Sequence, residues 1–145
     1  MVDFATQNLH FRLKSNRSYG IMEQSQKEEC TMTESSLMIK SKEFALEVIR
    51  ACRVLREAKC ESALINQFLR SGTSIGANIR EAFYAHGKAD FVAKLHIALK
   101  ECSETEYWLE LLTESGYYHD KTILDRCVEV KRILIASINT AKDKQ

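Results

Sequence analysis

The sequence predicts an all-α protein that folds as an antiparallel, up-down-up-down four-helix bundle. The 145 residues include no proline and five glycines, so helix interiors lack their commonest breaker. Apolar residues recur with the period of an α-helix through four segments, and no segment alternates as a strand does. Short connections between these segments favour antiparallel neighbours. The length suits one domain with a substantial core.

The first 36 residues read as an extension that precedes the bundle. They show no sustained period and contain polar clusters such as residues 23–29, EQSQKEE. Their apolar content is low for ordering a backbone, so we expect a poorly ordered, disordered segment with at most a short turn of helix. The bundle domain then spans residues 37–145. Met22 and Met32 are alternative start positions, which leaves open whether residues 1–31 belong to the native product.

The first two helices are predicted at residues 41–58 and 61–85. Ser41 suits the N-cap of the first, whose core face is spaced i, i+4, i+8, i+11. The apolar period of the second runs in phase across Gly72 and Gly76, which favours one continuous helix over a turn at residues 71–72. These glycines would let another backbone approach closely. Gly87 suits the C-cap position.

The last two helices are predicted at residues 88–115 and 121–141. Gly116 suits the position after the third helix, where glycine is favoured, and Asp120 suits the cap of the fourth. Lys131 interrupts the apolar stripe of the fourth helix.

Charge and composition narrow the function classes. The net charge of +1 lacks the basic excess of typical nucleic-acid binders. It is unevenly spread: residues 40–81 hold eight Lys/Arg against five Asp/Glu, and residues 88–119 hold three against six. No apolar run approaches the roughly 20 residues that span a membrane. The N-terminus does not resemble a secretory signal, and the five dispersed cysteines suit reduced thiols, so we expect a cytoplasmic protein.

Two polar stripes lie on neighbouring predicted helices. Each set keeps helical spacing and so shares one helix face, which predicts a polar network or a subunit interface; a solvated face and a functional pocket are the alternatives. The candidate residues are Ser71, Ser74, Asn78 and Glu81 on the second helix, and Asp90, Lys94, Glu101, Glu104 and Trp108 on the third.

The chain carries no recognisable catalytic device. The Glu-x-x-His pairs of di-metal bundles are absent, and Cys102 and Cys127 lie on apolar stripes typical of a core. No nucleophile has a base at a known spacing. We therefore expect no enzyme activity, no metal and no cofactor.

One side of the first helix is basic. Arg50, Arg53 and Arg56 form a candidate nucleic-acid-binding patch, since phosphate is bound through such charges. The aromatic side chains of a single-strand platform are missing from this helix. A solvated face, or pairing with another subunit, is the alternative.

Several sequence blocks resemble one family. They are residues 69–82, LRSGTSIGANIREA, followed by residues 90–91, 94–95, 98–101, 104–105, 107–109 and 111–117. This pattern, over roughly residues 38–143, resembles the four helix bundle protein family, also called the 23S rRNA intervening-sequence protein family. The resemblance implies a bacterial protein and a ring-shaped homo-oligomer, most simply a pentamer. A related branch comprises accessory proteins of diversity-generating retroelements, which are basic and bind nucleic acid and a reverse transcriptase; the near-zero charge of this chain departs from that branch.

Two hypotheses of function follow. The first is a non-catalytic, homo-oligomeric scaffold or interaction protein. The second is a nucleic-acid-binding accessory module, acting with an RNA or reverse-transcriptase partner, in which a weak basic patch becomes avid when repeated around a ring. Neither hypothesis involves a membrane.

Overall fold

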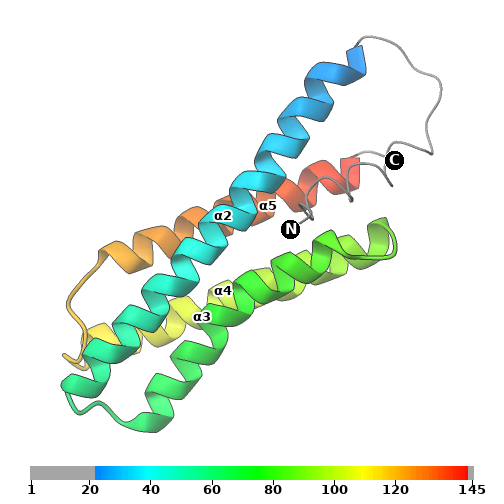
Figure 1. Ribbon diagram of the computed structural model, residues 1–145. Coiled ribbons are helices and arrows are strands. Elements are labelled where there is room, and N and C mark those ends of the chain that lie inside the picture. Colours follow the sequence, from blue (N-terminus) through cyan, green and yellow to red (C-terminus); the bar gives the residue numbers. More distant parts are fainter. Residues whose placement is uncertain (1–21, 144–145) are drawn as a thin grey trace, which may run out of the picture. The chain divides into compact units, whose positions relative to one another are not determined.

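The chain folds into four α-helices in the computed structural model, which describes residues 22–143 (Figure 1). In chain order the helices are α2 (Met22–Glu57), α3 (Ser62–Phe83), α4 (Lys88–Glu114) and α5 (Thr122–Asp143). No strand occurs among the described residues. The bundle lies within a compact unit of residues 33–145, and every side-chain contact reported below is inside that unit.

Contacts between successive pairs of helices close the bundle. The backbone of Gly72 on α3 lies against Val48 on α2, and Arg70 on α3 pairs with Glu104 on α4. Lys131 joins α5 to α4, while Arg126 on α5 returns to Glu47 on α2. Each helix therefore contacts two neighbours. Since the connections at residues 58–61, 84–87 and 115–121 are short, successive helices run antiparallel, which confirms the predicted fold class.

The core consists of the inward positions of all four helices. Phe44 on α2 and Phe68 on α3 are its largest fully buried side chains. Leucine, isoleucine and valine from every helix surround them, at the i, i+3, i+4 and i+7 spacing seen in the sequence. The buried polar residues are Ser41, Ser71, Thr105 and Ser137.

The first helix begins earlier than predicted. It starts at Met22, and Ser41 is not an N-cap but a buried residue in mid-helix, whose hydroxyl donates to the carbonyl of Met38 over 3.1 Å. Residues 22–40 contain no proline or glycine and are rich in glutamate, glutamine, lysine and methionine, which are good helix formers. Helix propensity thus explains why α2 extends over residues whose sequence has no helical apolar period. The expected disorder of residues 1–21 falls outside the described residues, and the boundary at residue 37 stays a prediction.

The predicted continuity of the second helix is confirmed, since α3 runs unbroken through Gly72 and Gly76. Gly72 is the point of close approach. A Cβ atom built there would lie 2.7 Å from Cγ2 of Val48, whereas one at Gly76 would meet the carbonyl oxygen of Ser41 at 3.4 Å. The absence of a side chain at Gly72 therefore lets α2 and α3 pack closely.

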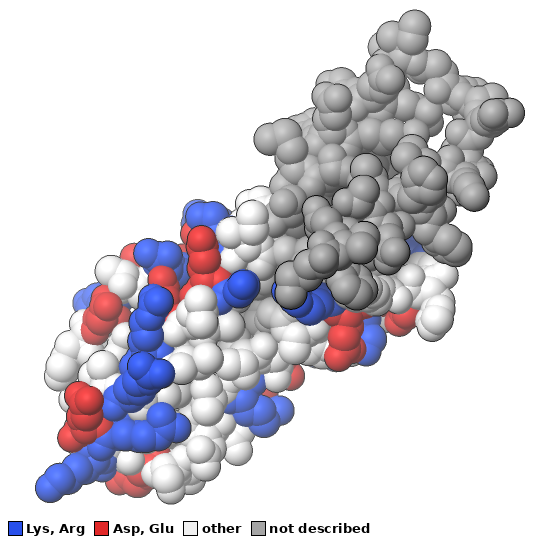
Figure 2. Space-filling model, viewed as in Figure 1, with Lys and Arg blue, Asp and Glu red and all other residues white. Residues whose placement is uncertain are grey.

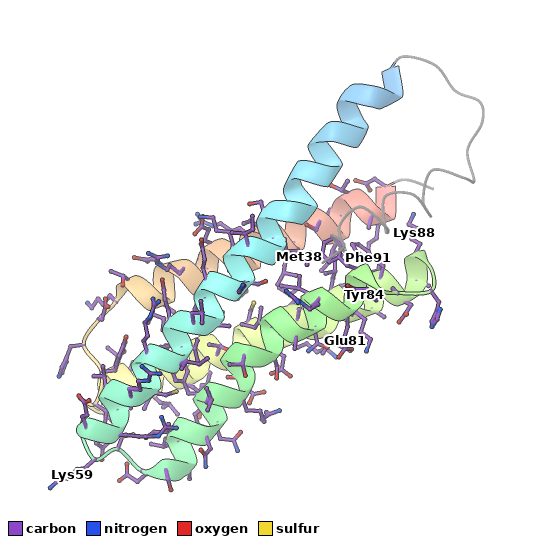
Figure 3. The ribbon with its side chains drawn as sticks, viewed as in Figure 1. Met38, Lys59, Glu81, Tyr84, Lys88 and Phe91 are labelled. Atoms are coloured by element: carbon purple, nitrogen blue, oxygen red, sulfur yellow. The ribbon has the colours of Figure 1, made fainter. Side chains whose placement is uncertain are left out.

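The helices α2 and α4 end in the same way. At the end of α4, Gly116 has φ +80°, and the N–H groups of Gly116 and Tyr117 bond back to the helix carbonyls. At the end of α2, Lys59 takes the same left-handed conformation with φ 55°, and Cys60 donates to the carbonyl of Leu55 over 3.0 Å. Both ends are Schellman motifs. Figure 3 shows Lys59 at this end of the bundle.

Of the three predicted caps beyond the first helix, two are confirmed and one is wrong. Gly116 follows α4 as predicted, and Asp120 caps α5 by accepting the backbone N–H of Thr122 over 2.9 Å. Hydrogen bonds from Thr122 lower the pKa of that carboxyl group. Gly87, however, is the N-cap of α4 with an extended backbone, because α3 already ends at Phe83 and Tyr84 is its C-cap.

Candidate functional site: the polar and basic faces of the bundle

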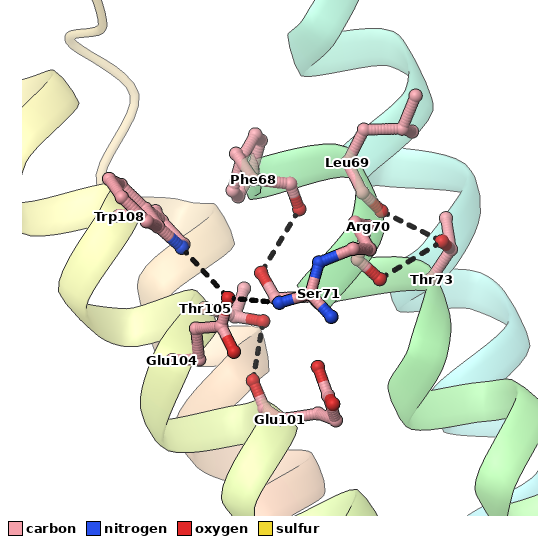
Figure 4. Close-up of polar contacts among 9 residues, drawn as sticks. All are labelled: Phe68, Leu69, Arg70, Ser71, Thr73, Glu101, Glu104, Thr105 and Trp108. Carbon is pink, nitrogen blue, oxygen red and sulfur yellow. Dashed lines mark hydrogen bonds and ion pairs between the residues drawn. The ribbon is translucent and has the colours of Figure 1, made fainter. Parts of the chain in front are cut away.

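The central cluster of the polar face joins α3 to α4 through one carboxylate. Nη2 of Arg70 lies 2.6 Å from Oε1 of Glu104, and the indole Nε1 of Trp108 donates to the same oxygen over 3.2 Å (Figure 4). Glu104 and Trp108, two of the predicted stripe residues, are thus brought together. Arg70 was not among the predicted residues, although it shares a helix face with Ser74 and Glu81 by its spacing of i, i+4, i+11.

A second ion pair lies nearer the end of α3. Nζ of Lys94 lies 2.5 Å from Oε2 of Glu81, and this contact raises the pKa of the lysine. Asp90, one turn earlier on α4, accepts the backbone N–H of His86 over 3.3 Å. Glu81 and Lys94 therefore form an ion pair between α3 and α4, as the predicted polar network requires. Asp90 instead bonds to the backbone just before its own helix.

The small polar residues of the stripe bond within α3. The hydroxyl of the buried Ser71 donates to the carbonyl of Phe68 over 3.2 Å, and Nδ2 of Asn78 donates to the carbonyl of Ser74 over 2.9 Å. Two ion pairs, rather than one interdigitated network, hence connect the polar faces of α3 and α4. The role of these faces as a subunit interface stays a prediction.

Glu101 is the exception on this face, since one of its carboxylate oxygens lacks a hydrogen-bond partner among the described residues. Oε2 is buried and has no hydrogen-bond partner among the described residues. The hydroxyl of Thr105 bonds instead to the backbone carbonyl of Glu101 over 2.7 Å. Burial, reinforced by the charge of Glu104 and opposed by that of Arg70, raises the pKa of the Glu101 carboxyl group.

Lys131, which interrupts the apolar stripe of α5, has a partner on α4. Nζ of Lys131 lies 2.5 Å from Oε2 of Glu106, and the two side chains are 30% and 18% exposed. The hydrogen bond with Glu106 raises the pKa of Lys131. Lys131 is therefore engaged inside the bundle, not presented as part of a basic surface.

The predicted basic patch lies on the outside of α2. Arg50, Arg53 and Arg56 are all exposed, and Arg56 makes only a long contact of 3.5 Å to the carbonyl of Cys52. Figure 2 shows Lys and Arg side chains gathered at the end of the bundle where α2 gives way to α3. The structure thus presents these arginines to solvent.

The four cysteines whose side chains the structure describes are buried. Cys52, Cys60, Cys102 and Cys127 are free thiols, and the residues that the structure describes contain no group of three or more potential metal ligands. The thiol of Cys127 donates to the carbonyl of Cys102 over 3.7 Å. Its hydrogen bond with Cys102, together with burial, raises the pKa of Cys127, which disfavours the reactive thiolate.

A shallow groove of about 240 Å³ runs between α2 and α3. Small residues line it, among them Ser41, Ala45 and Gly76, with Lys42 and Arg80 at its rim. It carries no cluster of catalytic groups. Over the described part of the chain, no helix combines the length and the apolar character that a membrane span needs.

Comparison with known proteins settles the family. The sequence profile of the family described as 23S rRNA-intervening sequence protein matches residues 33–136. The chain belongs to this family. The matched region begins within α2 and ends within α5, so it contains both polar faces and the basic patch.

A solved structure supports the same assignment for this 23S rRNA-intervening sequence protein family member. The chain is 43% identical to a protein of unknown function from the S23 ribosomal protein family of Bacteroides thetaiotaomicron VPI-5482, with a TM-score of 0.71. The match covers 74% of this chain and 98% of that protein. No curated protein matches the chain.

Proposed function

We propose that this protein is a non-catalytic, homo-oligomeric scaffold that binds its partners through the outside of its bundle, in the bacterial cytoplasm. The observation that best supports this proposal is the number of large apolar side chains that are exposed on a small bundle. Among the described side chains, four lie on α2 and two on α4, with exposed fractions of 38–55%, while α5 contributes one and Tyr84 follows the end of α3. Exposed apolar residues that cluster mark interaction surfaces in soluble proteins.

The chemistry of the interior supports a binding role. The described thiols are buried, Lys131 is paired with Glu106, and no group of three potential metal ligands occurs in the described residues. A catalytic site needs a nucleophile, base or metal that a substrate can reach. The outer surface is therefore the part of the molecule left to carry function.

Light scattering at micromolar concentration tests the proposal. We expect a mass several times the 16.6 kDa of the chain, with five copies as the expected ring. A mass of one chain at every concentration would contradict it.

The second candidate function, a nucleic-acid-binding accessory module, is favoured by the exposure of Arg50, Arg53 and Arg56. A binding assay titrated with salt separates the two candidates, because few phosphate contacts give binding that fades as salt rises. We expect weak binding at low salt and none at physiological salt. Tight binding at physiological salt that an Arg50→Glu/Arg53→Glu variant abolishes would favour the accessory module instead.

A further inference from the structure

Large exposed apolar side chains gather on two of the four helices. On α2 they are Ile39, Leu46, Ile49 and Val54, and on α4 they are Ile97 and Tyr107. Among the residues whose side chains are described, α3 exposes none and α5 a single one, Ile135, while Tyr84 lies just after the end of α3. The helices α2 and α4 are thus apolar on their outer as well as their core side.

The outer residues of α2 follow a heptad. Spacings of three and four alternate along the helix, the pattern by which one helix packs lengthwise against another. We call this set the α2 stripe: Ile39, Lys42, Leu46, Ile49 and Arg53. All five are exposed, and three of them are apolar.

The outer residues of α4 follow a heptad of the same kind. We call them the α4 stripe: Ala93, Ile97, Lys100, Glu104, Tyr107 and Leu111. Four of the six are apolar or aromatic. Glu104 and Leu111 are half-buried, and the others are exposed. Each stripe therefore offers a seam about two heptads long with large side chains at its contact positions.

The charges around the two stripes are complementary. Lys42 and Arg53 lie within the α2 stripe and Arg50 beside it, whereas Glu47 on the same helix is paired with Arg126 on α5. The helix that carries the α4 stripe has an acidic excess, since residues 88–114 hold three lysines against six acidic residues, of which Glu104 and Glu106 are paired with Arg70 and Lys131. Lys100 is the one cation within that stripe, one turn from Glu104. Opposite excesses favour contact between unlike stripes over contact between two α2 stripes.

The two stripes cannot meet within one molecule. Helix α2 contacts α3 and α5 through Val48 and Glu47, and α4 contacts the same two helices through Glu104 and Glu106. Hence α2 and α4 occupy opposite corners of the bundle, and their outer faces point away from each other. A second copy of the chain can provide the packing partner that each stripe lacks within its own molecule.

We propose that the α2 stripe of one copy packs against the α4 stripe of the next copy. Such a contact is heterologous, or head-to-tail, so every copy uses both stripes, and copies joined in this way form a ring when the rotation between them closes. The inference rests on the proposed homo-oligomer and names the surfaces that build it. It also assigns the basic side of α2 to protein contact.

The first test changes one residue on each stripe. Leu46→Glu on α2 and Ile97→Glu on α4 replace side chains that are 44% and 41% exposed with a good helix former. Each variant should lower the mass in light scattering to that of one chain, with unchanged helicity by circular dichroism. The matched control is Ile135→Glu on α5, a position 42% exposed, which should keep the wild-type mass.

Mixing the two variants tests whether the contact is head-to-tail, between unlike stripes. Leu46→Glu keeps an intact α4 stripe, and Ile97→Glu keeps an intact α2 stripe, so one good junction remains between unlike variants. We expect the mixture to form a dimer of twice 16.6 kDa, while each variant alone stays monomeric. A contact between two α2 stripes would instead leave Ile97→Glu oligomeric and give no mixed dimer, which overturns the proposal.

Two further results keep this inference separable from the proposed function. If the wild type is oligomeric and the Leu46→Glu variant has the same mass, the assignment of the interface to the two stripes is wrong, while the proposed scaffold function is not contradicted. A monomeric wild type would remove both. Arg53→Glu provides a milder second variant at an exposed site. It should also weaken assembly, with an effect that becomes smaller as salt rises, because salt screens contacts between surface charges.

Discussion

Val48 and Gly72 meet where α2 crosses α3. A Cβ atom at position 72 would lie 2.7 and 2.8 Å from the two γ-carbons of Val48. Val48 is fully buried, and its branched side chain has few rotamers, so it cannot move aside. This contact sets how closely the two helices approach.

Gly72→Ala should therefore destabilise the bundle. Overpacking costs about 1–3 kcal/mol, which exceeds the gain of up to about 1 kcal/mol from replacing a helical glycine. Urea unfolding measures the difference. Gly76→Ala is the matched control, because its Cβ meets Ser41 at an ordinary 3.4 Å and it should equal or exceed the wild type. Adding Val48→Ala to Gly72→Ala should recover stability relative to the sum of the single changes; simple additivity would show that the two sites do not interact.

Lys59→Gly should stabilise the protein by about 1 kcal/mol, since a left-handed residue other than glycine costs about 1–2 kcal/mol. The position has φ 55° and ends α2 as Gly116 ends α4. Thermal unfolding measures the effect. Gly116→Ala is the reverse change and should lose about as much stability. Equal melting temperatures for Lys59→Gly and the wild type would argue against strain at this turn.

Glu101→Gln should raise stability at neutral pH, with an effect that depends on pH. Burial raises the pKa of this carboxyl group above its unfolded value, so the folded state favours the protonated form. The resulting stability is present below the ordinary carboxyl pKa and is lost as pH rises through the raised one. The advantage of glutamine should shrink as pH falls, which melting curves at acid and neutral pH can follow. Glu110→Gln, at an exposed site of α4, should have little effect at either pH.

Lys131→Met should cost about 1–3 kcal/mol, because it leaves the largely buried Glu106 without its partner. The double variant Lys131→Met/Glu106→Leu should recover most of that loss, as replaced ion pairs often do. Urea unfolding at neutral pH compares the three proteins. In the wild type the raised pKa of Lys131 means that the pair stabilises below the ordinary lysine pKa and loses its effect as pH rises through the raised value. A double variant as unstable as the single one would show that Glu106 is not the cause.

Helical periodicity made most of this fold predictable. The predicted ends of α3, α4 and α5 lie within two residues of those observed, because an apolar stripe starts and stops where its helix does. The start of α2 was not predictable in that way, since the sequence of residues 22–36 has helix propensity without an apolar stripe of helical period. The left-handed turn at Lys59 gave no sequence signal, because glycine is the residue that such a turn favours.

The contacts between individual side chains of the polar faces were less predictable than the positions of those faces on the helices. Spacing placed Glu81, Lys94 and Glu104 on polar faces, but not which side chains would meet. Arg70 and Glu104 are 34 positions apart, and their contact depends on the register of α3 against α4. The uncompensated burial of Glu101 depends on the same register.

The contacts between α2 and α5 have a consequence for the order of folding. The pairs Lys40–Glu129 and Glu47–Arg126 join the first helix, α2, to the last, α5, so they close the longest loop between the helices. The hairpins of α3 with α4 and of α4 with α5 involve short loops, which close at a smaller entropic cost. The connection of α2 to α3 at residues 58–61 is short as well, so we expect α2 to pair with α3 early and its contact with α5 to form last. The two ion pairs that secure it against α5 are exposed, so dissolved ions reach this seam first, and hydrogen exchange should find it the earliest place where the native bundle opens.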